Sequence, residues 1–197
     1  MRAASAQTCS GGWLRRSGRH LIDMLARIGI GFLRVVDGDA FEPSNLNRQL
    51  LSEVSLLGVG KAQTAAERVR RVNPNVAVHA VGEFLTEENA AALLTDCDAV
   101  LDGLDNIQSR QILANACERA GIPLSTVPST DWVAQAAISC PRRSFDRLTL
   151  YPDGAALKNK SVLSFTPALC ASMQVSLCVS FSPTAPSEPE HCIFLTY

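Results

Sequence analysis

The sequence predicts an α/β fold with a largely parallel sheet, flanking helices and some antiparallel strands toward the C-terminus. Short apolar runs alternate along the chain with segments of helical period, and this alternation is typical of parallel strands joined by crossover helices. Two of the apolar runs end in acidic residues, which places polar groups where such sheets bind ligands. A chain of 197 residues has room for one domain of this kind.

The first apolar periodicity lies in residues 21–28 and predicts a helix that Gly29 ends. Residues 32–36 follow as a short apolar run, which predicts a buried strand that leads into Asp37. Residues 1–8 contain no comparable run, so the sequence predicts that a first, central strand is missing or poorly formed.

The next helix is predicted over residues 61–72, with a basic face and an end before the Asn-Pro pair at 73–74. Residues 76–81 alternate between apolar and polar side chains, as a half-buried strand does. Thr86 and the two glutamates after it are typical of a helix N-terminus and predict a helix to about Leu94.

Residues 99–101 form a short apolar strand that is followed at once by the segment Asp-Gly-Leu-Asp-Asn. A helix is predicted from Ser109, because Gly121 closes it and a proline follows. Residues 124–127 predict a further strand.

The C-terminal part supplies the predicted antiparallel strands, over residues 133–139 and 148–151, and a last helix over 167–179. Residues 161–187 carry no charge, but serines and a proline interrupt them, so a buried core helix is favoured over a membrane span. The proline-rich residues 181–197 are expected not to pack, which leaves residues 1–180 as the domain.

Charge and cysteine content exclude several functions. Eighteen basic residues against nineteen acidic ones, with a net charge of -1, give no excess of positive charge for a nucleic-acid partner. The seven cysteines form no Cys-x-x-Cys pair, so no zinc site is expected. Unpaired thiols without a signal-like start predict a cytoplasmic protein.

Polar side chains are predicted to meet beyond the carboxyl ends of the strands. Asp37, Asp105 and the loop at residues 44–48 all map to that edge. Carboxylates suit ribose hydroxyls or Mg²⁺, whereas Arg48 and Lys61 suit phosphate oxygens. The combination favours a nucleoside triphosphate site over a hydride-transfer site.

Five motifs then follow one another in a fixed order. They are Asp-Gly-Asp at 37–39, Glu-Pro-Ser-Asn-Leu-Asn-Arg-Gln at 42–49, Gly-Val-Gly-Lys-Ala at 58–62, Asn-Pro at 73–74 and Leu-Asp-Gly-Leu-Asp-Asn at 101–106. Over roughly residues 20–180 this series resembles the ThiF/MoeB/HesA family, which is related to ubiquitin-activating enzymes. The resemblance implies a Rossmann-like fold and a homodimer.

The resemblance also implies an activity. Members use ATP and Mg²⁺ to adenylate the C-terminal Gly-Gly carboxylate of a ubiquitin-like sulfur carrier of the ThiS or MoaD type, in thiamine or molybdopterin biosynthesis. The products are the acyl-adenylate and pyrophosphate. Arg48, Lys61 and Asp105 become the implied catalytic residues, because electrostatic clamping is what this phosphoryl chemistry requires.

Each motif residue receives an implied role in the same way. Asp37 would contact the ribose hydroxyls and Asp105 the metal. Asn45, Arg48 and Lys61 would contact the phosphates. The full implied nucleotide-binding set is Gly11, Gly12, Asp37, Ser44, Asn45, Arg48, Lys61, Asp105 and Asn106.

Alternatives follow from the atypical residues 1–18. Trp13 and the arginines at 15 and 16 stand where the family has small residues in a phosphate-binding glycine loop. A protein that docks a carrier or partner without turnover is therefore an alternative. A dinucleotide-dependent oxidoreductase is a further one, although it leaves Arg48, Lys61 and Asp105 without a role. A thiol function for Cys140 or Cys170 is also left open.

Overall fold

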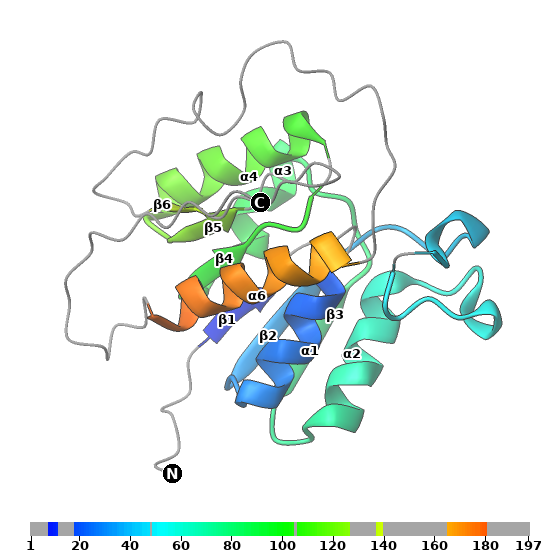
Figure 1. The fold of residues 1–197 in the computed structure, drawn as a ribbon. Coiled ribbons are helices and arrows are strands. Elements are labelled where there is room, and N and C mark those ends of the chain that lie inside the picture. The colour runs from blue at the N-terminus through cyan, green and yellow to red at the C-terminus, as the bar shows by residue number, and fades with distance from the viewer. Residues whose placement is uncertain are drawn as a thin grey trace.

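The computed structural model describes residues 8–11, 18–47, 49–104, 106–126, 137–139 and 165–180. Within these residues the strands form one six-stranded sheet in the order β3-β2-β1-β4-β5-β6 (Figure 1). Strands β1 to β5 pair in parallel, and β6 runs antiparallel to β5. The strands are β1 Thr8–Gly11, β2 Phe32–Val36, β3 Ala77–Val81, β4 Ala99–Leu101, β5 Leu124–Thr126 and β6 Ala137–Ser139.

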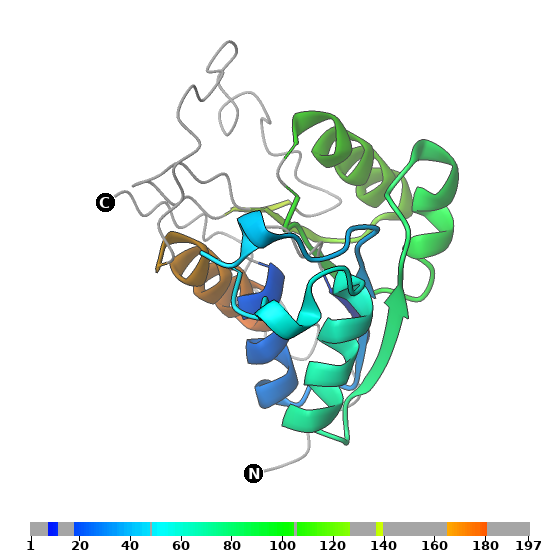
Figure 2. The same ribbon diagram turned by 90° about the vertical axis from the view of Figure 1, so that its right-hand side faces the viewer.

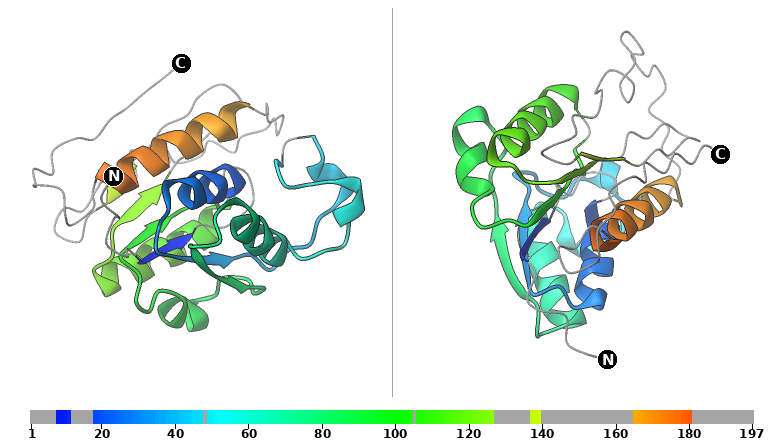
Figure 3. Two further views of the ribbon diagram at one scale, coloured as in Figure 1. Left: turned by 90° about the horizontal axis from the view of Figure 1, so that it is seen from below. Right: turned by 90° about the vertical axis from the view of Figure 1, so that its left-hand side faces the viewer.

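Helices cover both faces of this sheet. Helices α1, α2 and α6 lie on one face, and α3 and α4 lie on the other (Figure 3, left). The helices are α1 Gly18–Ile28, α2 Lys61–Val72, α3 Glu87–Leu93, α4 Ile107–Ala120 and α6 Phe165–Ser180. The predicted α/β class, the parallel sheet and the flanking helices are thus confirmed, as is an antiparallel strand toward the C-terminus.

The expectation of a missing first strand is wrong. Strand β1 occupies the centre of the sheet and pairs with β2 from Thr8↔Phe32 to Gly11↔Val35, and with β4 at Cys9↔Ala99. Its sequence, Thr-Cys-Ser-Gly, has little apolar character. Neighbours on both sides supply its backbone hydrogen bonds, and this tertiary context outweighs a weak local preference.

Two apolar clusters hold the layers together. The first lies under α1, α2 and α6 and includes Leu25, Leu33, Val69 and Val175. The second lies on the opposite face of the sheet, under α3 and α4, and its larger members are Val36, Leu85, Leu94, Val100, Leu104, Leu113 and Leu124. Their separation shows that the sheet is buried on both faces, as a parallel sheet requires.

Helix α6 is a core helix, as the sequence predicts. Ala171, Val175 and Cys178 belong to the first apolar cluster, and α6 packs on α1. No helix in the described part of the chain combines the length and apolar content needed to cross a bilayer. The predicted strand at 148–151 and the tail at 181–197 lie outside the described residues, as do residues 133–136.

Helix α4 begins two residues earlier than the sequence predicts. Asn106 precedes it in extended conformation, and its side-chain oxygen accepts a hydrogen bond from the Ser109 amide at 2.7 Å. Asn106 is therefore the N-cap, a role in which asparagine is favoured. Gly121 closes the helix with a φ of 68°, the left-handed conformation that glycine adopts most readily.

Candidate functional site

The carboxyl ends of three adjacent strands define the candidate site. Strand β2 leads into Asp37, β4 leads into Asp102, and β1, which lies between them, ends at Gly11. In open parallel sheets this edge is where ligands bind. Gly12, Arg48 and Asp105, which the sequence also assigns to the site, lie outside the described residues.

Asp37 and Lys61 are brought together by Asp39. The Asp39 amide donates to Asp37 Oδ1 at 2.9 Å, and Lys61 Nζ forms an ion pair with Asp39 Oδ2 at 2.9 Å. Asp37 is buried, and the Lys61 side chain is 5% exposed. Asp39 is not among the predicted site residues, because nothing in the spacing shows that an acid at 39 meets a lysine 22 positions later.

The chain between these residues, which we call the crossover segment, spans residues 40–60 (Figure 2). Ala40 and Gly60 form an antiparallel bridge, and Phe41 exchanges backbone hydrogen bonds with Gly58 and Val59 at 2.9 and 3.0 Å. The segment therefore leaves the sheet and returns to its starting point. This return places Lys61, the first residue of α2, beside Asp39.

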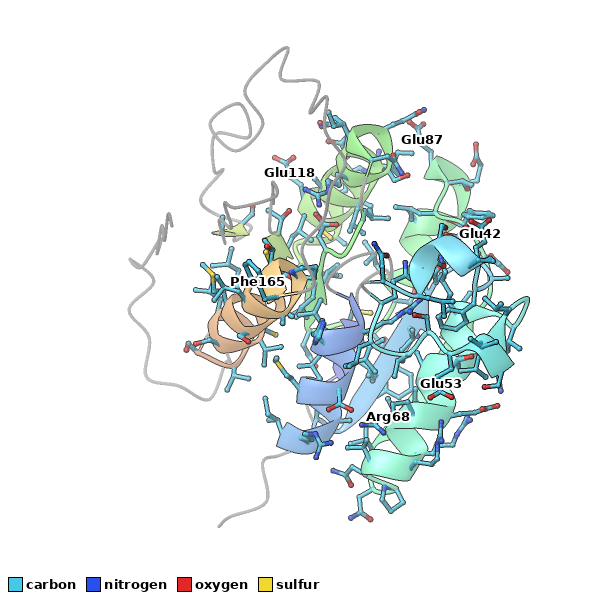
Figure 4. All side chains as sticks on the ribbon, turned by 45° about the vertical axis from the view of Figure 1, so that its right-hand side comes forward. Glu42, Glu53, Arg68, Glu87, Glu118 and Phe165 are labelled. Atoms are coloured by element: carbon cyan, nitrogen blue, oxygen red, sulfur yellow. The ribbon has the colours of Figure 1, made fainter. Side chains whose placement is uncertain are left out.

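Ser44 and Asn45 lie together at the 3-10 turn Pro43–Asn45 of the crossover segment. Asn45 is buried, its side-chain oxygen accepts from the Glu42 amide at 3.2 Å, and its amide group donates to Ser44 Oγ at 3.2 Å. These contacts stabilise the turn, so Asn45 has a structural role here, and its contact with a phosphate stays a prediction. Figure 4 shows the side chains of this segment, with Glu42 and Glu53 labelled.

A buried arginine adjoins the same segment. Arg19 lies in the first turn of α1, is 1% exposed, and places its guanidinium carbon 4.2 Å from the centre of the Phe41 ring. A cation over an aromatic face is favourable, more so when both are shielded from water. Arg19 is not predictable from the sequence, because a lone arginine carries no signal of burial.

At the end of β4, Asp102 organises the chain that leads to α4. Its Oδ1 accepts from the Leu104 amide at 2.8 Å, and its Oδ2 accepts from Thr126 Oγ1 at 2.6 Å. Arg110 lies 3.5 Å from the same carboxylate and donates to the Leu104 carbonyl. From the opposite side, Gln174 of α6 donates to the carbonyl oxygens of Asp102 and Ser125. The loop is thus fixed on both sides of residue 103.

The groups present fit a nucleoside triphosphate. Asp37 offers a carboxylate at the end of β2, where ribose hydroxyls bind in this kind of sheet. An ammonium has three N–H donors, and within the described residues the ion pair with Asp39 occupies one donor of Lys61. No cluster of three or more metal-ligating side chains occurs in that part of the chain. Nucleotide-bound Mg²⁺ needs only one or two protein carboxylates, so the Mg²⁺ contact through Asp105 stays a prediction.

The glycine between the two acids makes a close contact that can be tested. A Cβ at Gly38 would lie 2.8 Å from the Phe84 ring and 2.8 Å from the Phe84 backbone nitrogen. Because a backbone atom is involved, rotation of the ring cannot relieve the clash. We therefore expect Gly38→Ala to lower the free energy of unfolding by about 1–3 kcal/mol, measured by urea denaturation.

Gly82→Ala is the matched control for Gly38→Ala. This substitution also adds one methyl group, at a glycine in the loop that contains Phe84. A Cβ at Gly82 would meet nothing within 4 Å. We expect its unfolding midpoint to equal or slightly exceed that of the unmodified protein. Equal losses in the two variants would contradict the close packing at Gly38.

Of the two thiols left open by the sequence, Cys140 lies outside the described residues, and Cys170 is buried in α6 at 1% exposure. Another thiol, Cys117 of α4, lies near the Asp102 network. Burial, with the Asp102 charge and Cys97 adding to it, raises the pKa of Cys117 to about 12. A thiol reacts as its thiolate, so Cys117 is held in the unreactive form at neutral pH.

We expect iodoacetamide at pH 8 to leave Cys117 unmodified in the folded protein and to alkylate it fully in urea. Peptide mass mapping distinguishes this cysteine from the others. Alkylation of Cys117 in the folded protein at the rate seen in urea would contradict its burial.

Comparison with known proteins identifies the family to which the chain is similar. A family model described as the ThiF family matches residues 16–191. The SAMP-activating enzyme E1 of Haloferax volcanii is 39% identical over 107 residues, which are 54% of this chain and 40% of that protein. The molybdopterin-synthase adenylyltransferase of Escherichia coli is 37% identical over 100 residues, or 51% of this chain and 40% of that protein. The matched region spans about two fifths of these curated relatives.

Solved structures share the fold over most of the chain. The crystal structure of the E. coli tRNA N6-threonylcarbamoyladenosine dehydratase aligns with a TM-score of 0.71 and 25% identity, covering 89% of this chain and 85% of that chain. The same protein in complex with ATP aligns with a TM-score of 0.71 and 24% identity, with the same coverage. The likeness in fold therefore covers most of this chain and most of that protein.

Proposed function

The chain belongs to the ThiF family, and we propose that it uses ATP to adenylate a carboxylate of its substrate. The observation that carries this proposal is the chain of contacts Asp37–Asp39–Lys61, which sets a carboxylate and a cation side by side at the ligand-binding edge. The names of the relatives support it, since several are adenylyltransferases, and a structure of similar fold was solved with ATP.

The reaction makes limited demands on the protein. A carboxylate oxygen of the substrate bonds to the α-phosphorus of ATP, and pyrophosphate leaves. Both reactants are anions, so the protein must hold them together against their repulsion and align them. Lys61 would offset phosphate charge, and Asp37 would fix the ribose. No side-chain nucleophile is required for this step.

The finer parts of the proposal concern substrate and assembly. We propose that the carboxylate is the C-terminal Gly-Gly carboxylate of a ubiquitin-like sulfur carrier in the cytoplasm, in molybdopterin or thiamine biosynthesis, and that the protein works as a homodimer. Support comes from the molybdopterin-synthase adenylyltransferase and the SAMP-activating enzyme among the relatives. Relatives named tRNA threonylcarbamoyladenosine dehydratase act on a different substrate, so the carrier must be tested directly.

The test is exchange of labelled pyrophosphate into ATP in the presence of Mg²⁺ and a carrier that ends in Gly-Gly. We expect exchange that depends on the carrier and is absent with a carrier lacking its last two glycines. Carrier binding without exchange would overturn the proposed activity in favour of a docking protein without turnover. Such a result would agree with the bulky residues at positions 13, 15 and 16.

A further inference from the structure

An exposed aromatic ring lies directly beside the acid proposed to bind ribose. Phe84 follows β3 and is 59% exposed. Its Cγ and Cδ2 atoms lie so close to Gly38 that a Cβ there would come within 2.8 Å of them. Gly38 is the covalent neighbour of Asp37, so the ring borders the proposed ribose position.

The backbone around Phe84 is held on both sides. Before it, the Val81 carbonyl accepts from the Asp37 amide at 3.1 Å, which ties the end of β3 to the end of β2. At the residue itself, Asn89 of α3 donates to the Phe84 carbonyl at 2.9 Å. After it, Leu85 is buried in the second apolar cluster. The backbone that carries the exposed ring is therefore held in place in advance, as the support of a binding group should be.

Single exposed apolar residues are common on protein surfaces, so exposure alone carries no weight. The position of Phe84, against Gly38, does carry weight. Among the aromatic residues in the described part of the chain, Phe84 and Phe165 are exposed, and Phe165 begins α6 (Figure 4). Phe84 is the one that contacts the turn containing Asp37.

We propose that the base of the bound nucleotide stacks on the ring of Phe84. This inference rests on the proposed ATP site, because it takes Asp37 as the ribose contact. The base is bonded directly to the ribose, so ribose hydroxyls held at Asp37 place the base within reach of the ring beside Gly38. Stacking on an aromatic face requires no particular hydrogen-bond pattern of the base. Phe84 therefore distinguishes nucleotides from inorganic polyphosphates, and it discriminates weakly between adenine and guanine.

The test measures ATP and inorganic tripolyphosphate binding by titration calorimetry. Phe84→Ala is expected to raise the Kd for ATP about tenfold, the loss of one base–aromatic contact, and to leave the Kd for tripolyphosphate unchanged. Phe84→Leu keeps an apolar contact with Gly38 but removes the aromatic face, so it should lose most of the same affinity. Phe84→Trp should retain it. Val54→Ala, which shortens another exposed apolar side chain in the crossover segment, is expected to change neither Kd.

The exchange assay gives a second readout. Phe84→Ala should raise the KM for ATP about tenfold while kcat and the KM for pyrophosphate stay the same. Equal weakening of ATP and tripolyphosphate would assign Phe84 a structural role and overturn the inference. Unchanged ATP affinity in Phe84→Ala would also overturn it, with the proposed function intact. Failure of the unmodified protein to bind ATP would overturn both.

Discussion

Lys61→Met is expected to reduce pyrophosphate exchange by about 10²- to 10³-fold, the loss typical of removing one preorganised group that stabilises transition-state charge. Methionine replaces the aliphatic part of the lysine side chain, which is 5% exposed, without its ammonium group. It removes the cation proposed for the phosphates and leaves Asp39 without its partner Lys61 beside the incoming negative charge. The measurement is kcat/KM for exchange with a saturating carrier.

A double variant distinguishes the effect of Lys61→Met on exchange from its effect on the stability of the fold. Lys61→Met alone should also destabilise the fold, because it leaves the Asp39 carboxylate, 22% exposed, without this cation. Lys61→Met with Asp39→Asn removes both charges and should recover most of the unfolding free energy without recovering exchange. Recovery of exchange together with stability would show that Lys61 acts only through folding.

Arg68→Met is the matched control on the same helix. Arg68 pairs with Asp23 of α1 near the surface, with 35% of its side chain exposed. Exposed ion pairs contribute about 1 kcal/mol or less, so exchange is expected to stay within about twofold of the unmodified protein. A loss as large as that of Lys61→Met would mean that any charge removed from α2 impairs the assay.

The elements that carry strong periodicity were predictable from the sequence. Helix α2 has the predicted bounds, and β2 ends at Val36, directly before Asp37, as predicted, because apolar spacing and helix stops record burial locally. Strand β1 was not predictable in this way. Its residues are polar or small, and its place in the sheet depends on pairing with β2 and β4, which lie far along the chain.

The site likewise contains some features that local sequence records and others that depend on distant parts of the chain. Asp37 and Lys61 could be proposed because each stands in a recognisable motif. The ion pair of Lys61 with Asp39 depends on how the crossover segment returns to the sheet, and no local pattern records that path. Asn106 illustrates a further limit, because the residue types that bind phosphates also cap helices, and spacing alone does not separate the two roles.

Asp102→Ala is expected to lower the free energy of unfolding by about 3–5 kcal/mol. This loss is large, because the whole unfolding free energy of a typical domain is about 5–15 kcal/mol. Asp102 is 2% exposed, and its carboxylate binds the Leu104 amide and the Thr126 hydroxyl and faces Arg110. Alanine removes these contacts at once and leaves the arginine, whose side chain is 15% exposed, without this carboxylate.

Asp102→Asn keeps the shape and one acceptor but removes the charge, so its loss should be smaller, about 1–3 kcal/mol. It should also lower the pKa of Cys117 below that of the unmodified protein, because the Asp102 charge is one cause of the raised value. Asp23→Asn makes the same change at an acid paired with two arginines near the surface and should cost about 1 kcal/mol or less. Equal losses at positions 102 and 23, measured by urea denaturation, would contradict the view that the Asp102 network fixes the loop between β4 and α4.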